Sequence, residues 1–312
     1  MRAEDMVLIS VDDHVVEPPD MFEGRVPARY ADVAPRLVRK EDGTDVWKYD
    51  GKEIPNIGLN AVAGRPLEEY GMEPTSFDEI RDGCFDVHQR VRDMNVNGVL
   101  ASMCFSSFPN LCGQLFARSS DLEAGHAVLQ AYNDWHVDEW CASYPGRFIP
   151  LGLVPIWDPK LMADEVHRLA DKGCHAVSFS ENPARLRLPS FHSEHWNPFW
   201  SACVDEGTIV CLHIGSSSSL VVTAQDAPID VLITLQPVNI VQCAADIMWS
   251  PILRKFPDLR IALSEGGIGW IPYLLERLDW IYTRHHAWTG QDFDGRLPSE
   301  VFRERIVTCF ID

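Results

Sequence analysis

Short apolar segments alternate with longer amphipathic segments along most of the chain. The apolar segments are rich in β-branched residues, which is typical of strands buried on both faces. Between them, apolar residues recur at helical spacing among charged residues. This alternation predicts βα units around a parallel sheet. The seven expected strands span residues 7–11, 98–103, 148–154, 176–180, 209–214, 260–264 and 305–311.

The expected helices lie between these strands and end at recognisable stop signals. Residues 121–144 run into Pro145-Gly146, and residues 159–172 precede Gly173, a residue type favoured just after a helix. Further helices are expected over residues 197–206, 239–256 and 270–285. The pattern predicts an α/β fold, a (β/α)8 TIM-like barrel that ends after its seventh strand. The alternative is an open doubly wound sheet, but no glycine-rich phosphate-binding motif follows any strand.

Residues 17–85 depart from the βα pattern. They are rich in Pro and Gly and contain one hairpin-like piece, residues 45–54, with a turn at Asp50-Gly51. A long irregular segment inside a compact domain usually serves function. We therefore expect one barrel domain over residues 1–312, in which residues 17–85 form a lid or a dimer arm. The four serines at 216–219 are the only low-complexity tract.

Composition excludes several classes of protein. The chain has 312 residues, 46% of them hydrophobic, which argues against disorder for the bulk of the chain. Lys and Arg total 27 and Asp and Glu total 46, which gives a net charge of −19. Such a charge disfavours nucleic acids and anionic membranes as partners. The expected partner is a small-molecule substrate, and the aromatic residues of the insertion favour a homodimer.

The cysteines and the N-terminal residues indicate the cellular compartment in which the protein is expected. The nine cysteines include no CxxC pair, which disfavours a disulfide framework and a zinc knuckle. The N-terminus carries no signal-peptide pattern. Both observations favour the reducing cytoplasm.

Ionisable residues stand at the ends of several predicted strands, where a barrel carries its reactive groups. Asp12 and His14 are two positions apart, so a strand would point both to one side, as two ligands of a metal ion. His213 would add a neutral imidazole from another strand. Glu181 and Glu265 could ligate, bridge two ions or act as a general base.

Each of these residues also has an ordinary structural interpretation. The spacing of Asp12 and His14 occurs by chance in many proteins, and a lone His213 could be a core histidine. Glu181 and Glu265 could stabilise the start of the next helix. Their joint placement at strand ends, where core positions should be apolar, favours the metal site.

A segment dense in aromatic and histidine residues, 191–200 (FHSEHWNPFW), follows the fourth expected strand. It would either line a pocket or pack around the start of a helix. The candidate substrate-binding residues are His192, His195 and Trp196 of this segment, together with Asn182.

Five segments, taken in order, carry a family resemblance. They are residues 12–18 (DDHVVEP), 90–99 (RVRDMNVNGV), 195–200 (HWNPFW), 212–215 (LHIG) and 256–260 (FPDLR). As a set they resemble the amidohydrolase superfamily, in the amidohydrolase-related branch with aminocarboxymuconate-semialdehyde decarboxylase and the hydroxybenzoate decarboxylases.

The resemblance implies a distorted (β/α)8 barrel and a divalent metal (zinc, manganese or iron, as one or two ions). It places the family's first-strand ligand pair on Asp12 and His14 and its fifth-strand ligand on His213. Where the family often has a histidine after strand six, this chain has Glu265. The family's aspartate ligand at the end of strand eight has no counterpart in this sequence.

These observations predict a metal-dependent hydrolase or non-oxidative decarboxylase of a small carboxylated or cyclic organic substrate, with Glu265 and His213 as catalytic residues. One alternative is a dinuclear non-haem iron monooxygenase on the same barrel, with a substrate that could be linked to coenzyme A, because mixed carboxylate and imidazole ligands also suit iron. Another is a catalytically inactive barrel that acts as a binding module.

Overall fold

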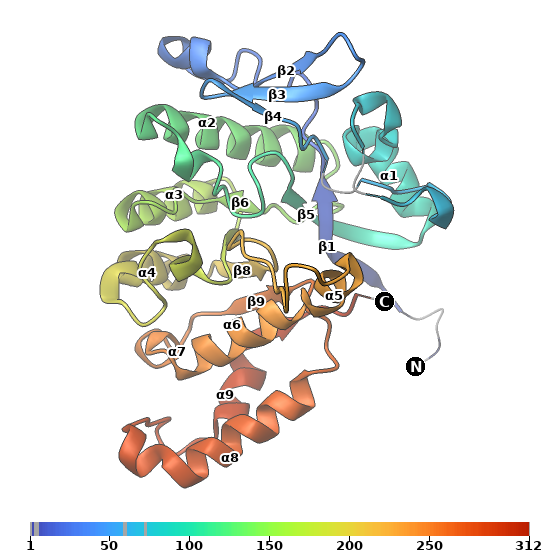
Figure 1. Ribbon diagram of the computed structural model, residues 1–312. Coiled ribbons are helices and arrows are strands. Elements are labelled where there is room, and N and C mark those ends of the chain that lie inside the picture. Colours follow the sequence, from blue (N-terminus) through green and yellow to red (C-terminus); the bar gives the residue numbers. More distant parts are fainter. Residues whose placement is uncertain (1, 3–5, 59–60, 72–73, 312) are drawn as a thin grey trace. The chain divides into compact units, whose positions relative to one another are not determined.

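A computed structural model describes residues 2, 6–58, 61–71 and 74–311. The chain divides into two compact units, Met1–Ile156 and Trp157–Asp312, called here the N-terminal and C-terminal units. Each unit contains parallel strands and helices, so the predicted α/β class is confirmed (Figure 1). Closure of the strands into one barrel domain stays a prediction.

The N-terminal unit contains a parallel pair, β1 (Leu8–Val15) and β5 (Val99–Ser106). Ser10 lies opposite Ser102 and Asp13 lies opposite Cys104, so β1 has one extra residue, a β-bulge. The expectation that the first strand ends at residue 11 is therefore wrong, because the strand continues beyond the bulge to Val15.

Asp13 fastens this bulge. Its carboxylate accepts hydrogen bonds from the hydroxyls of Ser10, at 2.8 Å, and of Ser102. Arg90 Nη1 lies 3.7 Å from the same carboxylate, and Arg90 Nη2 donates to the carbonyl of His14 at 2.6 Å. Arg90 belongs to α1 (Val87–Val96), a helix that the apolar pattern did not predict. Asp13 and Arg90 thus fix the backbone on both sides of Asp12 and His14.

The predicted insertion contains a three-stranded antiparallel sheet. Its strands are β2 (Arg36–Arg39), β3 (Asp45–Tyr49) and β4 (Lys52–Ile54), in that order. The predicted hairpin is confirmed, and Asp50 and Gly51 both have a positive φ, at 52° and 71°, which matches the twist of a tight hairpin. The strand β2 was not predicted. Arg39 holds the sheet together through two hydrogen bonds to Asp45, at 2.8 and 2.7 Å.

Helix α2 (Leu122–Trp135) is capped by Asp121 and is followed by a π-helix, His136–Cys141, so the predicted helix over 121–144 changes its hydrogen bonding part way. The strand expected over 148–154 is reduced to β6 (Gly152–Leu153). Asn133 of α2 donates to the carbonyl of Leu153 and accepts from its N–H, both at 2.8 Å. This side chain takes the hydrogen bonds that a strand neighbour would otherwise provide.

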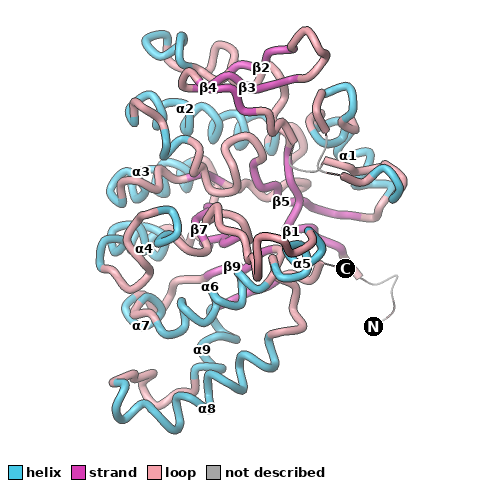
Figure 2. The backbone as a smooth tube through the Cα atoms, in the orientation of Figure 1, coloured by secondary structure: helices cyan, strands magenta, loops and turns pink. Residues whose placement is uncertain are grey.

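The C-terminal unit contains parallel strands in the order β10-β9-β8-β7. Two of them, β7 and β9, are labelled among the magenta strands of Figure 2. The four strands are β7 (Ala176–Ser180), β8 (Ile209–His213), β9 (Ile261–Ser264) and β10 (Ile306–Thr308), with bounds that differ from the predicted ones by at most three residues. Ser180 lies opposite His213, and His213 lies opposite Ser264. The carboxyl ends of three strands therefore lie in one row.

Most helices of this unit lie where the spacing of apolar residues predicts them. Three predicted helices are confirmed as α3 (Pro159–Asp171), α4 (Asn197–Asp205) and α8 (Ile271–Thr289). The expected helix over 239–256 is divided into α6 (Val238–Trp249) and α7 (Ile252–Lys255), because Pro251 cannot donate within a helix. Two short helices, α5 (Ile229–Leu235) and α9 (Pro298–Arg305), were not predicted.

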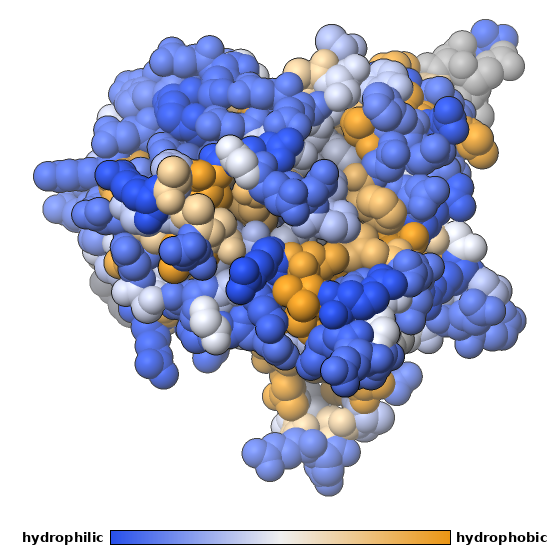
Figure 3. Space-filling model, turned by 90° about the horizontal axis from the view of Figure 1, so that it is seen from above, coloured by the Kyte–Doolittle hydropathy of each residue, from blue (hydrophilic) through white to orange (hydrophobic). Residues whose placement is uncertain are grey.

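The stretch Ile229–Trp249 is long and apolar enough to cross a membrane, by length and composition only. Such a stretch is weak support for a membrane span, because core helices of soluble proteins pass the same test. Pro237 lies between α5 and α6, and α6 buries Ile240, Ala244 and Ile247 among others. The face of the molecule in Figure 3 is largely hydrophilic, with hydrophobic side chains in scattered groups. A homodimer, a cytoplasmic location and the absence of nucleic-acid and membrane partners stay predictions.

The core of the N-terminal unit is aromatic where the insertion meets the loop after β5. Trp47 of β3 is fully buried, and its ring lies 4.6 Å from that of Phe108 and 5.9 Å from that of Phe22. We expect Trp47→Ala to lower the free energy of unfolding by about 3–5 kcal/mol, because it removes a large buried ring and leaves a cavity. Urea denaturation measures the effect.

The matched control is Trp288→Ala, since Trp288 is 76% exposed. It should change the free energy of unfolding by no more than about 0.5 kcal/mol. Equal effects of the two substitutions would contradict the aromatic core.

A second buried feature of this unit is the carboxylate of Glu17, which is fully buried just after β1. It accepts hydrogen bonds from the backbone N–H groups of Ser107, at 3.1 Å, and Phe108, at 2.7 Å. Burial raises the pKa of Glu17 to about 7, although these hydrogen bonds oppose the shift. Glu17 thus joins the end of β1 to the loop after β5 and costs stability when it is charged.

This raised pKa predicts a pH-dependent stability. The folded state binds the Glu17 proton more tightly than the unfolded state, whose pKa is near 4.5, so the stabilising contribution is complete below that pH and is lost as the pH rises through about 7. Between about pH 5 and about pH 8, the wild type should lose about 2–3 kcal/mol relative to Glu17→Gln. Urea denaturation across this range tests it, with the exposed Glu23→Gln as the control. Parallel curves for wild type and Glu17→Gln would contradict the assignment.

Candidate functional site

His213 is the last residue of β8 and is 1% exposed. Its Nδ1 lies 2.6 Å from the carbonyl oxygen of Ile214. A carbonyl only accepts hydrogen bonds, so Nδ1 carries the proton and Nε2 presents a lone pair. This is the arrangement in which a histidine binds a metal ion through Nε2, with its other nitrogen fixed by a backbone carbonyl.

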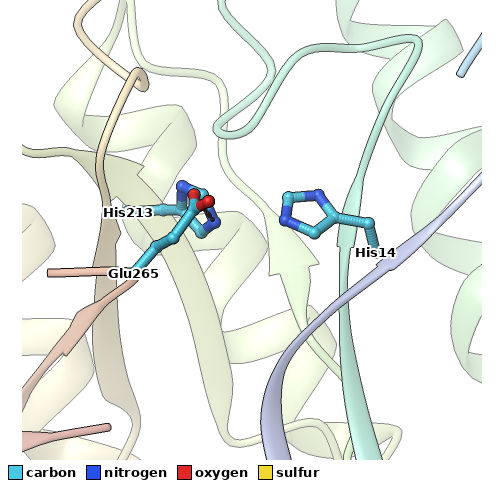
Figure 4. Close-up of side chains that lie close together, drawn as sticks. All are labelled: His14, His213 and Glu265. Atoms are coloured by element: carbon cyan, nitrogen blue, oxygen red, sulfur yellow. Dashed lines mark ion pairs between the residues drawn. The ribbon is translucent and has the colours of Figure 1, made fainter. Parts of the chain in front are cut away.

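Glu265 follows β9 and faces His213 (Figure 4). Its Oε2 lies 3.1 Å from His213 Nε2, and its side chain is 42% exposed. A carboxylate and an imidazole lone pair both need a positive partner in this contact. A proton or a divalent ion can supply it, so this pair of donors fits both a metal site and a site of proton transfer. The row of strand ends brings the two predicted residues together.

Glu181 follows β7 and is 2% exposed. Its two carboxylate oxygens accept hydrogen bonds from the hydroxyls of Ser216 and, at 2.6 Å, Ser217. Burial raises the pKa of Glu181, and the two serine hydroxyls oppose this rise. Glu181 therefore anchors the loop after β8, the loop that begins just beyond His213.

Glu181 is one of the residues that line a cavity of about 240 Å³ in the C-terminal unit. Its lining includes Asn182, Arg185, Asn239 and Gln242. Amide, guanidinium and carboxylate groups converge there, which suits a small polar molecule. Asn182, predicted to bind substrate, thus lines a cavity beside Glu181.

Asp12 and His14 lie on β1 in the N-terminal unit. Burial lowers the pKa of His14 to about 4, so the imidazole is neutral at pH 7 and can serve as a ligand. Both side chains line a cavity of about 630 Å³. Residues Val62 and Gly64 of the insertion line the same cavity, together with Arg81. The insertion therefore borders the predicted first-strand ligand pair.

The aromatic and histidine segment divides between surface and core. His192 is exposed and its Nε2 hydrogen-bonds to Asp246 at 2.7 Å, and His195 is exposed and packs edge-on against Trp196. Trp196 itself is fully buried, lies 5.0 Å from the ring of Phe179 and donates to the carbonyl of Pro189 at 3.0 Å. Trp196 thus has the environment of a core residue, which gives no support to its predicted role in substrate binding.

The residues that the sequence analysis missed are Ser216 and Ser217. In the sequence they are part of a serine tract without an evident role. A signal was present, because a carboxylate such as Glu181 can be buried only when it finds hydrogen-bond donors. Hydroxyl groups three and four positions after the strand-end His213 were available donors.

Comparisons with known proteins agree with the parallel-strand architecture. Residues 72–311 match the family model described as amidohydrolase. A search of curated proteins gives no match. An amidohydrolase from Mycobacterium avium subsp. paratuberculosis K-10 has a similar structure, with a TM-score of 0.70 and 18% identity, over 98% of this chain and 83% of that chain.

Two decarboxylases also have similar structures. The 5-carboxyvanillate decarboxylase of Sphingomonas paucimobilis has a TM-score of 0.63 and 20% identity, over 97% of this chain and 80% of that chain. A dihydroxybenzoic acid decarboxylase from Polaromonas sp. JS666, with bound manganese and the inhibitor 2-nitroresorcinol, has a TM-score of 0.61 and 18% identity. The match covers 97% of this chain and 78% of that chain. At these identities the likeness shows a shared fold.

The family match covers most of the chain and includes the strand ends at Glu181, His213 and Glu265. It also agrees with the motifs that indicated the same branch from the sequence. The chain belongs to the amidohydrolase family, whose members are metal-dependent enzymes.

Proposed function

We propose that this protein is a metal-dependent hydrolase or non-oxidative decarboxylase of a small carboxylated or cyclic organic substrate. The observation that carries the proposal is the 3.1 Å approach of the Glu265 carboxylate to Nε2 of the buried His213. The decarboxylases of similar fold are named for 5-carboxyvanillate and dihydroxybenzoic acid, and substrates of that chemistry are the first to test.

The proposed metal ligands are Asp12 and His14 from β1 and His213 from β8. Two imidazoles and a carboxylate suit zinc, manganese or iron. Bound there, a divalent ion would polarise a substrate oxygen or lower the pKa of a bound water. Two of the proposed ligands suit this role. The lowered pKa keeps the His14 imidazole neutral, and the hydrogen bond to the Ile214 carbonyl fixes the orientation of the His213 ring.

Glu265 is the proposed proton carrier. Its side chain is partly exposed, so it can meet a substrate, while His213 beside it is buried. In a decarboxylation, the carbon that loses CO2 must gain a proton. In a hydrolysis, the attacking water must lose one. A carboxyl group at this position can perform either transfer.

The geometry favours one metal ion over two. A bridging role for Glu181 would require its carboxylate oxygens to face the ions, whereas both accept hydrogen bonds from serine hydroxyls. We therefore propose that Glu181 supports the loop after β8, with Ser216 and Ser217. The dinuclear iron oxygenase is the less favoured alternative for this reason.

Metal binding tests the proposed ligands. The wild type should bind about one divalent ion per chain, and His213→Ala should bind it at least about tenfold more weakly, because a direct ligand is lost. Elemental mass spectrometry after dialysis against manganese or zinc measures this.

Two variants serve as controls for the metal experiment. His167→Ala removes an exposed histidine that pairs with Glu206, and it should leave the metal content unchanged. Glu181→Gln should also keep the ion. Unchanged metal content in His213→Ala would refute the site, and about two irons per chain with dioxygen consumption would favour the oxygenase.

Substitution of Glu265 tests the proton carrier. Glu265→Gln keeps the size of the side chain but cannot carry a proton, and Glu265 is not one of the proposed ligands, so kcat should fall by about 100- to 10,000-fold while the metal content is retained. CO2 release from dihydroxybenzoates and 5-carboxyvanillate, and ring opening of small lactones, are the assays. The control Glu194→Gln changes a 78% exposed carboxylate paired with Lys255 and should leave kcat unchanged. Wild-type kcat in Glu265→Gln would exclude Glu265 as the proton carrier.

A further inference from the structure

Gly266 follows Glu265 and has no room for a side chain. A Cβ at this position would lie 1.9 Å from Cγ2 of Ile240, 2.7 Å from its Cβ and 3.2 Å from its Cγ1. Real Cβ atoms essentially never come within 3.0 Å of another group, so the backbone of this turn lies directly against Ile240 of α6. Ile240 is fully buried, and protein interiors are close-packed, so moving its side chain would disturb its neighbours.

The residue beside this contact has an unusual backbone conformation. Glu265 has a φ of 55°, in the left-handed region that is unfavourable for a residue with a side chain. Such a conformation persists only where the surroundings impose it, and it is concentrated at functional sites. Here it accompanies the orientation that brings the Glu265 carboxylate to His213.

A second contact holds the same turn on another side. The indole N–H of Trp270 donates to the carbonyl oxygen of Gly266 at 2.9 Å. The ring of Trp270 packs edge-on against Phe302, at 6.3 Å. The peptide that follows Glu265 is therefore held between Ile240 of α6 and Trp270 just before α8. Both contacts act on the backbone and leave the carboxylate of Glu265 accessible.

We propose that Gly266 and Ile240 are positioning residues for Glu265. The missing side chain at 266 lets α6 press on the turn, and this packing keeps Glu265 in the left-handed conformation that directs its carboxylate to His213. Neither residue touches the reacting groups. The inference rests on the proposed function of Glu265 as the proton carrier.

The test is a set of variants around the contact, assayed with the substrate that the wild type turns over. Gly266→Ala should lower kcat by about 10- to 100-fold, because a displacement of about 1 Å is enough to misplace a catalytic group. KM should change little, since the metal ligands and the cavity are untouched. Gly269→Ala is the matched control, because Gly269 has no atom within 4 Å of an added Cβ and should keep wild-type kcat.

The second part of the test removes the Ile240 atoms that an added Cβ at residue 266 would meet. Ile240→Gly removes all three of these atoms, at 1.9, 2.7 and 3.2 Å, so the double variant Gly266→Ala/Ile240→Gly should recover kcat several-fold over Gly266→Ala. Ile240→Val keeps Cγ2 and should behave as the wild type. No recovery in the double variant, with a cooperative thermal melt in both, would overturn the proposal.

The Glu265→Gln background separates this inference from the proposed function. If Gly266 acts through Glu265, Gly266→Ala should not lower kcat further once Glu265→Gln is present. Additive losses would show a general structural effect and overturn the positioning role. If Glu265→Gln alone leaves kcat unchanged, the proposed function of Glu265 fails. If Glu265→Gln lowers kcat and Gly266→Ala does not, only the positioning role fails.

Discussion

The parallel register of β7, β8 and β9 is the constraint on which the candidate site of the C-terminal unit depends. Backbone pairing aligns Ser180, His213 and Ser264 in one row. The residue after each outer strand then has to emerge at the same edge as His213. The Glu265 carboxylate lies 3.1 Å from Nε2 of His213. The Glu181 carboxylate instead accepts hydrogen bonds from two serines of the loop after β8. One register thus produces two carboxylates with different tasks.

Buried carboxylates organise the loops in both units. Glu17 holds the backbone after β5, and Glu181 holds the serines after β8. A buried charge is costly, so each carboxylate is supplied with donors by the loop it fixes. A loop conformation that lost these donors would leave a buried carboxylate without hydrogen bonds, which is unfavourable. This explains how irregular segments at strand ends keep a definite shape beside a reactive site.

The apolar pattern was sufficient to predict most strands and helices, since burial on both faces of a parallel sheet leaves a continuous apolar run. Residues 209–212 (IVCL) of β8 show this directly. The failures have non-local causes. At the bulge in β1, Asp13 bonds to Ser102, eighty-nine positions away, and in β6 the backbone of Leu153 bonds to the side chain of Asn133. The candidate site was anticipated from residue types at strand ends, but the partners of Glu181 and the packing behind Glu265 could not be, because both arise from loops and helices that meet only in the fold.

The insertion has a consequence for how such enzymes diversify. Its antiparallel sheet has its own backbone pairing and its own ion pairs. Other residues of the insertion, among them Val62 and Gly64, line the cavity around Asp12 and His14. Exchange of cavity-lining residues such as Val62 leaves the β1–β5 pair and its Asp13 anchor in place. Under the proposed function, the insertion residues that line this cavity and the proposed catalytic residues at the strand ends are encoded in separate stretches of the gene. On that proposal, changes in the insertion would alter substrate preference while the residues at the strand ends stay as they are.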